Sequence, residues 1–371
     1  MTPRALGIIG FEADHIKVEG LGNHRPMMSI SFMGRYRLVD FPISNFTNSN
    51  IDDIHVYVKE KPRSVFEHVG TGRHYNINSK QGRLRVMYGE HEISSSIYNT
   101  DVRAYLQNES FIWENKSDYV IVAPTHFIYT QDFDKVLDKH IESNKDITVL
   151  YHSCKNAKED FLGLTTLNLD REKNITGFEV NRGQAKQRNI SLETYVMKKT
   201  VFFDLLREAD YRSRIYWLKE IIEEAVHKYS MRGYPVMGTV LGITDLQSYY
   251  DVSMRMLDKE KPRLITRSWP IYTKTNDSPP AIYDVTADVE SSSIANGTVI
   301  KGKVSNSIIG RNVIIEKGAI VENSIILPSS YIGRGVHVRG AVVDRHVCIE
   351  KTKMIDGSRD NLIYINRHDK I

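Results

Sequence analysis

The segment VIVAPTHFIYT (120–130) lies where an α/β enzyme commonly places a catalytic carboxylate. A buried apolar run ends in a short loop, and a helical pattern follows. Ligands of open α/β sheets bind beyond the carboxyl ends of the strands, so the loop is a candidate site. It carries Pro124, Thr125 and His126 but no acid. A single histidine such as His126 is more typical of a hydrogen-bonded structural group than of a catalyst.

Composition excludes several other kinds of chemistry. The only cysteines are Cys154 and Cys348, without a CxxC pair or Cys/His metal spacing, which suits a reducing compartment. The formal charge of +4 comes from 50 basic and 46 acidic residues without a long basic run, so nucleic acid is not an expected partner. No signal peptide or membrane span is recognised. We expect a soluble cytoplasmic protein, in which a patch for a small anionic ligand stays open.

The 371 residues are 41% apolar and suffice for two domains. Short β-branched runs predict strands at 5–11, 54–59, 119–124 and 147–152. Helical spacing predicts two amphipathic helices between or after them, with apolar faces formed by Phe133, Val136, Leu137, His140 and Ile141, and by Leu218, Ile221, Ile222, Ala225 and Val226. Alternating strands and helices predict a Rossmann-like α/β domain over residues 1–255, with a mostly parallel sheet.

The composition and the spacing of apolar residues change in the last third of the sequence. Residues 256–285 are rich in proline and predict a linker across the surface of the first domain. In residues 286–371, aliphatic residues recur every six positions, at Ile308, Ile314, Ile320, Ile326, Ile332 and Val338. This period predicts a left-handed parallel β-helix of hexapeptide repeats, with these residues pointing inward and five glycines at the corners, namely Gly302, Gly310, Gly318, Gly333 and Gly335. A β-sandwich of short strands is the alternative. Stacked coils leave flat ends, so we expect this domain to mediate assembly.

Three segments, in the order expected, resemble bacterial glucose-1-phosphate adenylyltransferases (ADP-glucose pyrophosphorylases). They are GRYRLVDFPISNFTNSNI (34–51), WPIYT (269–273) with PPAIY (279–283), and NSIILPSSYIGRGVHVRGAVVDRHVCI (323–349). The resemblance covers nearly the whole chain. It implies a nucleotidyltransferase domain followed by a β-helix, and a reaction that joins ATP to glucose 1-phosphate in bacterial glycogen biosynthesis.

The chemical positions that the resemblance implies are degenerate in this chain. The glycine-rich phosphate loop becomes Gly10 followed by Phe11, Glu12, Ala13 and Asp14, whose charges and side chains oppose a triphosphate. Mg²⁺ in this family is held by two aspartates, and Thr125 and Gly242 align with them. Asp245, the nearest acid to Gly242, is typical of a helix N-cap.

The sugar site departs from the family as well. Asn181 aligns with the lysine that grips the sugar phosphate, and Arg103 replaces an acid of the glucose-contacting turn. Arg182 follows Asn181, but strand alternation would point it to the other face. The resemblance therefore implies a pseudoenzyme with no catalytic residues, no metal and no cofactor of its own, Mg²⁺ being needed only in a catalytic partner.

Basic residues outside the cleft define a candidate regulatory site for a sugar-phosphate or nucleotide effector. Arginines bind such anions bidentately, and the family has an anion site built from comparable segments. The candidates outside the cleft are Arg35, Arg37, Arg339 and Arg345, together with Arg25, which matches the family's lysine near the phosphates. Solvated surface charges are the alternative reading.

The sequence thus predicts a non-catalytic regulatory subunit that joins a catalytic glucose-1-phosphate adenylyltransferase in a hetero-oligomer, a tetramer by resemblance, and shifts its conformational equilibrium. One alternative is an active sugar-phosphate nucleotidyltransferase with altered metal ligands, and another is a free-standing sensor of a sugar phosphate or nucleotide. A hexapeptide acyltransferase using His337 or His346 as base is disfavoured, because such enzymes lack a domain of the first kind.

Overall fold

The computed structural model describes residues 4–11, 16–77, 82–88, 99–213, 215–258 and 264–371. The chain forms two compact units, each assembled from segments that are apart in sequence. Unit 1 takes residues 1–15, 39–241 and 264–272, and unit 2 takes residues 16–38, 242–263 and 273–371. The sequence boundaries predicted at residues 255 and 285 stay a prediction.

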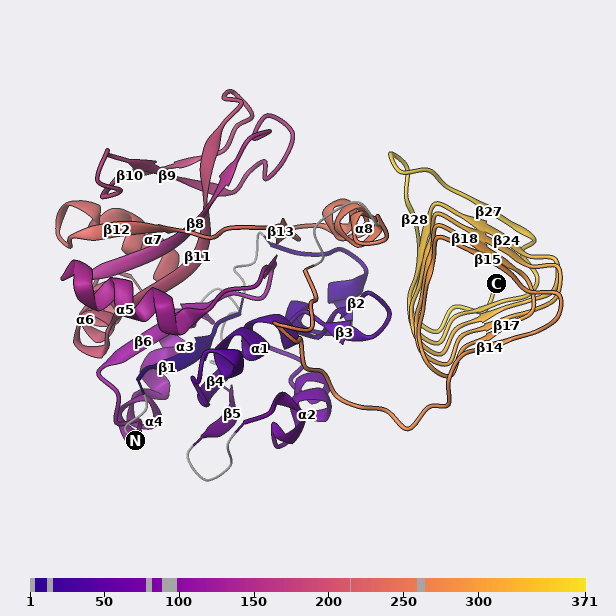
Figure 1. Cartoon of the computed structure of the whole chain (residues 1–371), viewed down its shortest axis with the longest axis horizontal. Helices are drawn as coiled ribbons and strands as arrows, with labels where there is room; N and C mark the ends of the chain where they lie inside the picture. The colour runs from indigo at the N-terminus through magenta and orange to yellow at the C-terminus, as the bar shows by residue number, and fades with distance from the viewer. Residues whose placement is uncertain (1–3, 12–15, 78–81, 89–98, 214, 259–263) are drawn as a thin grey trace. The chain divides into compact units, whose positions relative to one another are not determined.

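Unit 1 is built on a mixed β-sheet (Figure 1). Its longest path is β10–β9–β11–β6–β1–β4–β5, and β8 joins β11 to β12. The strands are β1 (Leu6–Ile9), β4 (Asp53–Val58), β5 (Arg83–Tyr88), β6 (Tyr119–Ala123), β8 (Ile147–Cys154), β9 (Thr165–Leu169), β10 (Ile175–Val180), β11 (Arg188–Lys198) and β12 (Met231–Pro235). β1 pairs in parallel with β4 and β6, whereas β11 pairs antiparallel with β6 and β8. The four predicted strands and the mostly parallel sheet are confirmed.

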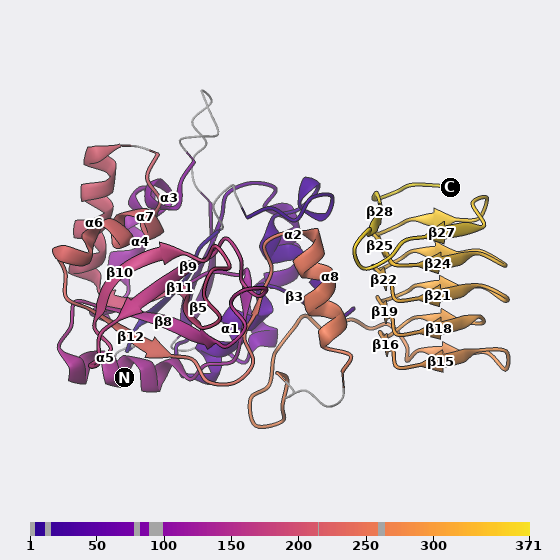
Figure 2. The same ribbon diagram turned by 90° about the horizontal axis from the view of Figure 1, so that it is seen from above.

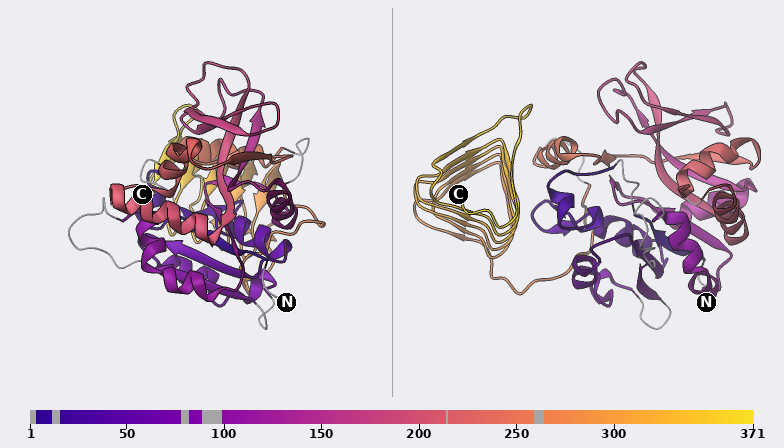
Figure 3. Two further views of the ribbon diagram at one scale, coloured as in Figure 1. Left: turned by 90° about the vertical axis from the view of Figure 1, so that its left-hand side faces the viewer. Right: turned by 180° about the vertical axis from the view of Figure 1, so that it is seen from behind.

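Helices cover the sheet on both faces (Figures 1 and 3). In unit 1 they are α1 (Asp40–Asn48), α2 (Arg63–Val69), α3 (Asp101–Gln107), α4 (Glu109–Glu114), α5 (Phe133–Ser143), α6 (Lys199–Arg212) and α7 (Leu218–Glu224). α5 and α7 are the two predicted amphipathic helices, and they bury most of the predicted positions. Ile141 was placed wrongly on the buried face, because it is 45% exposed. The apolar stripe of α5 is therefore narrower than the residue spacing alone predicted.

The middle of the proline-rich segment, residues 264–272, belongs to unit 1. The indole Nε1 of Trp269 donates to Asn45 on α1, and the Asn48 side chain donates to the carbonyl of Pro270. The Tyr272 N–H donates to the Ser44 hydroxyl. These polar contacts place residues 269–272 along α1, which agrees with a segment that crosses the surface of the first domain.

Unit 2 contains a triangular β-helix whose coils stack one above another (Figures 1 and 2). Three five-stranded parallel sheets form its sides. The first has β14 (Ile282–Tyr283), β17 (Val299–Ile300), β20 (Ile314–Ile315), β23 (Tyr331–Ile332) and β26 (Cys348–Ile349). The second has β15 (Asp288–Glu290), β18 (Lys303–Ser305), β21 (Ile320–Glu322), β24 (His337–Arg339) and β27 (Met354–Asp356). The third has β16 (Ser293–Ile294), β19 (Ile308–Ile309), β22 (Ile325–Ile326), β25 (Ala341–Val343) and β28 (Ile363–Ile365). The predicted β-helix is confirmed.

The predicted inward column was only half right. Ile326, Ile332 and Val338 belong to the inner core, but Ile308, Ile314 and Ile320 point outward, and their neighbours point inward instead. The frame slips because strand partners on the middle coils are 17 residues apart, as in Ile308 and Ile325 or Ile314 and Tyr331, rather than 18. One corner is therefore a residue shorter, and Asn306, Asn323 and Gly340 take positive φ there.

Two of the five corner glycines adopt the predicted backbone. Gly318 and Gly335 have φ of 77° and 66°, which side chains rarely tolerate. Gly302, Gly310 and Gly333 do not have positive φ and were wrongly explained. They lie where the backbone of the next coil approaches, and a Cβ on Gly302 would be 2.4 Å from the carbonyl oxygen of Ala319. Close stacking of coils, not a turn, excludes larger residues there.

Two other segments of unit 2 pack on the third side of the β-helix. One contains β2 (Ser31–Phe32) and β3 (Tyr36–Arg37), and the other contains α8 (Leu246–Arg255). Gly34 lies against the carbonyl of Ile309, and the Tyr250 hydroxyl donates to the carbonyl of Asn323. Two short strands, β7 (Phe127–Ile128) and β13 (Leu241–Gly242), complete the strands of the described chain. None of its helices combines the length and the apolar composition that a bilayer crossing requires.

Candidate functional site

A pocket lies in unit 1 where β6 and β1 end. It encloses about 530 Å³ including its open mouth, and its wall combines aromatic rings with carboxylates. The lining residues that matter for chemistry are Asp101, His126, Glu193, Lys219 and Glu220, and the aromatic ones are Phe11, Tyr105, Tyr195 and Trp217. The loop after β6 therefore opens on a pocket, as the carboxyl end of a strand in such a sheet predicts.

An ion pair within the protein occupies one side of the pocket. The Glu193 carboxylate lies 2.6 Å from the Lys219 ammonium and 3.7 Å from Nε2 of His126. Glu193 has φ of 48°, a left-handed conformation that costs a residue with a side chain about 1–2 kcal/mol. Strain of this kind persists only where the surroundings fix it. The protein thus supplies both charges of this site itself.

Asp101 begins α3 as a buried carboxyl group at the pocket wall. Its Oδ1 accepts hydrogen bonds from the N–H groups of Val102 and Leu218, at 2.8 and 3.0 Å. Burial raises the pKa of Asp101 to about 7, and the two hydrogen bonds oppose this rise only in part. The group joins the start of α3 to the start of α7, so its contacts describe a structural link between two helices.

The two positions that align with magnesium ligands do not fit a magnesium ion. Thr125 is fully buried after β6, and its neutral hydroxyl is a weak substitute for a carboxylate. Gly242 ends β13 and has no side chain. Asp245 caps α8 by accepting from the Ser248 N–H at 2.7 Å, which confirms the N-cap interpretation. In the parts of the chain that the structure describes, no three His, Cys, Asp or Glu side chains are grouped to hold a metal.

Asn181, the position of the sugar-phosphate lysine, is used to hold a loop. Its side chain is 2% exposed, and its amide nitrogen approaches the carbonyls of Ala157, Asp160 and Phe161 at 2.9–3.1 Å. Its carbonyl oxygen accepts from the Gly183 N–H. All of its polar capacity is engaged within the protein, so the side chain is not available to a substrate.

The remaining site predictions in unit 1 have mixed positions. Arg103 lies on α3 and forms an ion pair with Asp210 of α6 at 3.8 Å, and it is not among the residues that line the pocket. Gly10 lies in the pocket wall, where a Cβ would be 2.6 Å from the Tyr105 hydroxyl. Glu12, Ala13 and Asp14 lie outside the described residues. The degenerate positions therefore do not form one cluster.

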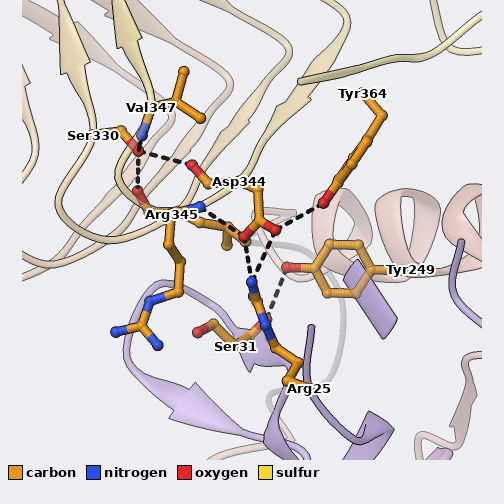
Figure 4. A network of polar contacts seen from close by, with 9 residues as sticks. Arg25, Ser31, Tyr249, Ser330, Asp344, Arg345, Val347 and Tyr364 are labelled. Atoms are coloured by element: carbon orange, nitrogen blue, oxygen red, sulfur yellow. Dashed lines mark hydrogen bonds and ion pairs between the residues drawn. The ribbon is translucent and has the colours of Figure 1, made fainter. Parts of the chain in front are cut away.

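Arg25, the first predicted anion-binding arginine, is buried in unit 2 against a carboxylate. Its Nη2 donates to both oxygens of Asp344 at 2.7 and 2.8 Å, and the exposed fractions of the two side chains are 4% and 0%. The Tyr364 hydroxyl and the Arg345 N–H also donate to this carboxylate. Figure 4 shows Asp344 at the centre of the network, with the nearby Tyr249 hydroxyl donating to the carbonyl of Ser31.

The other four predicted arginines have different surroundings. Arg35 is exposed and lies over the ring of Tyr36, and Arg37 is half-buried on β3. Arg339 is on the second side of the β-helix, in an exposed ion pair with Asp356 at 2.6 Å. Arg345 follows Asp344, and its side chain points away from the Asp344 carboxylate (Figure 4). A shared anion site for all five stays a prediction.

The sequence interpretation missed Asp344 and Tyr364. A signal existed, because the strand register aligns Asp344 with Gly310 and Leu327 on the preceding coils. An acid in a column of small or apolar residues of a β-helix requires a partner, since a buried charge is paired in folded proteins. Only the arrangement in space could identify that partner as Arg25, 319 positions away.

Comparison with known proteins agrees with both halves of the fold. The sequence model of the nucleotidyl transferase family matches residues 18–259, and a GlmU-like C-terminal hexapeptide model matches residues 282–362. The chain belongs to the nucleotidyl transferase family. The first match covers more than half of the chain and includes every pocket residue except Gly10 and Phe11.

Relatives in the family match over most of the length of this chain. A glucose-1-phosphate adenylyltransferase of Clostridioides difficile (strain 630) is 28% identical over 310 residues, which is 81% of this chain and 79% of the relative. A glycogen biosynthesis protein, GlgD, of Geobacillus stearothermophilus is 29% identical over 324 residues, 86% and 84% of the two chains. A glucose-1-phosphate adenylyltransferase of Bacillus thuringiensis (strain Al Hakam) is 27% identical over 336 residues, 88% of each chain. The resemblance to glucose-1-phosphate adenylyltransferases is confirmed.

Proposed function

We propose that this chain is a non-catalytic regulatory subunit of a glucose-1-phosphate adenylyltransferase in bacterial glycogen biosynthesis, and that it acts in the cytoplasm. The observation that carries the proposal is the state of the catalytic domain: Thr125 and Gly242 offer no carboxylate where the family's metal ligands align. Without carboxylates, the charge that develops during nucleotidyl transfer is not neutralised by protein-bound metal.

Two further features of unit 1 support an inactive cleft. Asn181 is engaged by three backbone carbonyls, so the acceptor phosphate loses its cationic partner. Glu193 and Lys219 form an ion pair inside the pocket. Because its charge is already neutralised, Lys219 would bind a phosphate only weakly. Each change could be compensated alone, but together they remove phosphate binding and charge stabilisation.

A subunit that has kept the fold but lost the reaction can still act, because its folded surface can bind a partner subunit. The chain keeps both the catalytic-type domain and the β-helix, and one of its relatives is named as a glycogen biosynthesis protein rather than as an adenylyltransferase. We therefore expect it to assemble with a catalytic paralogue in a hetero-oligomer and to bias that partner toward an active conformation, without a cofactor of its own.

The test is pyrophosphate release from ATP and glucose 1-phosphate with Mg²⁺, using this chain alone, the catalytic paralogue from the same genome alone, and the two together. We expect no turnover by this chain, and a raised rate or an altered effector response in the mixture. Turnover by this chain alone at rates typical of enzymes would favour an active enzyme with altered ligands. Binding of sugar phosphate or nucleotide without any effect on the paralogue would instead favour a free-standing sensor.

A further inference from the structure

The three outer sides of the β-helix differ in a way that its inner core does not explain. We call the side of β16, β19, β22, β25 and β28 the covered face, and the side of β15, β18, β21, β24 and β27 the charged face. The side of β14, β17, β20, β23 and β26 is the bare face. Inward residues of all three sides form one apolar core, so the outward residues report what each face contacts.

The covered face shows how this protein uses an apolar column. Ile308, Ile325 and Val342 point outward, yet they are only 1%, 1% and 0% exposed. They are buried where the chain's own segments 16–38 and 242–258 pack, as the contacts of Gly34 and Tyr250 show. On the covered face, an outward apolar column therefore serves as the docking surface for other segments of the same chain.

The charged face shows what a solvent-facing side looks like in the same domain. Its outward positions carry ion pairs between residues on neighbouring coils. These pairs are Lys303 with Asp288, His337 with Glu322, and Arg339 with Asp356, at 3.4, 3.2 and 2.6 Å. Polar pairs of this kind are compatible with water and need no partner chain.

The outward residues of the bare face are apolar, like those of the covered face. Unlike those, they are exposed to solvent, as are the outward residues of the charged face. Strand register places one outward residue per coil in a single column, namely Ile282, Val299, Ile314, Tyr331 and Cys348. Ile282 is 56% exposed and Ile314 is 36% exposed, and the other three are partly exposed. A continuous apolar patch on a soluble surface marks an interaction site more often than single exposed residues do.

Charges along the borders of the bare face restrict what can cover it. The corner toward the covered face carries Arg311, Arg345 and Arg367, the stacked rings of His346 and His368, and the carboxylate of Asp369, while the buried Asp344 is paired with Arg25. The opposite corner carries five basic and three acidic side chains. They are Lys301, Lys317, Arg334, Lys351 and Lys353, and Asp284, Glu316 and Glu350. Both borders are net positive, so two copies facing each other would bring like charges together.

We propose that the bare face docks the catalytic partner subunit, through an aliphatic strip that the partner borders with carboxylates. This inference rests on the proposed function and names the surface that would carry it. Five strands about 4.8 Å apart and about 15 Å wide offer roughly 350 Å² per partner. A stable interface buries about 1,200 Å² or more in total. The bare face is therefore one part of a larger contact. A charged side chain introduced at its centre would be buried away from solvent in the complex.

The test compares two aspartate substitutions on the same coil, six residues apart. Ile314→Asp lies at the centre of the bare face, and Ile320→Asp lies on the charged face. Each full-length chain is fluorescently labelled and titrated with the catalytic adenylyltransferase of the same genome, with sedimentation velocity as the readout. Thermal melting first confirms that both variants are folded, which partial exposure of both positions favours.

We expect Ile314→Asp to weaken assembly at least tenfold and Ile320→Asp to change it less than twofold. Raising the salt from about 0.05 to 0.5 M should also weaken the wild-type complex, because the borders attract carboxylates. Equal binding by wild type and Ile314→Asp would overturn the docking surface while leaving the regulatory subunit intact. No binding by wild type would overturn the proposed function, and with it this inference. A homodimer of wild type that Ile314→Asp dissociates would show that a second copy, not the catalytic partner, covers the face.

Discussion

The buried ion pair between Arg25 and Asp344 allows a quantitative test of how the β-helix holds the segment 16–38. Asp344→Leu removes the acceptor of four hydrogen bonds and leaves the Arg25 guanidinium 4% exposed without a counter-charge. Breaking a buried pair by removing one partner costs about 3–5 kcal/mol. At about 2–4 °C per kcal/mol, the melting temperature should fall by roughly 6–20 °C. Leucine fits the column, since Leu327 holds the aligned position on the preceding coil.

The double variant separates the charge from the packing. Arg25→Met with Asp344→Leu removes both charges, and leaves the Tyr364 hydroxyl and one backbone N–H without an acceptor, at about 1–3 kcal/mol. We expect the double variant to be more stable than either single variant, with a coupling free energy of at least about 2 kcal/mol in urea denaturation. Replacing a whole buried pair by apolar residues is often neutral, which is why recovery is expected.

An exposed pair on the same domain provides the control. Arg339 and Asp356 lie as close together, at 2.6 Å, but their side chains are 48% and 46% exposed. Arg339→Met should therefore lower stability far less than either substitution of the buried pair, because solvent screens the exposed charges. Single substitutions of Arg25 or Asp344 that cost no more than this control, or effects that simply add in the double variant, would refute the reasoning that burial makes this pair decisive.

Three further substitutions test the pocket and its surroundings. The pKa of Asp101, raised from 3.8 to about 7, means that the folded state binds more protons than the unfolded state between these values. The free energy of unfolding should therefore fall as pH rises from about 4 to 7 and then level off, and Asp101→Asn should remove this slope in pH-dependent melting curves. Glu193→Gly should be about 1 kcal/mol more stable than Glu193→Ala, because both lose the ion pair but only glycine relieves φ of 48°. An alanine variant of equal stability would contradict the strain. Asn181→Ala should cost about 2–3 kcal/mol by freeing buried backbone groups, against less than 1 kcal/mol for the more exposed Asn168→Ala, and equal costs would show that Asn181 does not hold the loop.

Much of the architecture could be predicted from patterns of apolar residues. The strands at 54–59 and 119–124 and the helix from Phe133 appear close to their predicted bounds, because buried strands and amphipathic helices have distinct periods. The β-helix was also predictable from its six-residue spacing. The slip of the inward frame between Val321 and Ile326 was not, because both alternatives place an isoleucine or valine in each coil. Which of two adjacent aliphatic residues points inward depends on the length of the corner before it.

The candidate site was predictable only as far as local sequence decides it. The loss of carboxylates at Thr125 and Gly242 can be read from the chain, and Asp245 could be assigned as an N-cap from its position before a helix. The contacts of Glu193 with Lys219 and of Arg25 with Asp344 join residues that are 26 and 319 positions apart. Nothing in the local pattern of either segment specifies its partner, so these pairs required the fold.

The stacking of the β-helix also has a mechanical consequence. Each coil of the β-helix contacts only the coil before it and the coil after it. Under tension along the chain, the coils should therefore unfold one at a time rather than all together. The coil that starts at Ile282 has a neighbour on one side only, whereas a late coil is tethered by Arg25 through Asp344. Pulling on the chain should therefore detach coils in sequence from the Ile282 end. The first coils repeat every 15 or 17 residues, so each detachment would lengthen the chain by about 50–60 Å, and a force spectrometer would record these steps as a sawtooth.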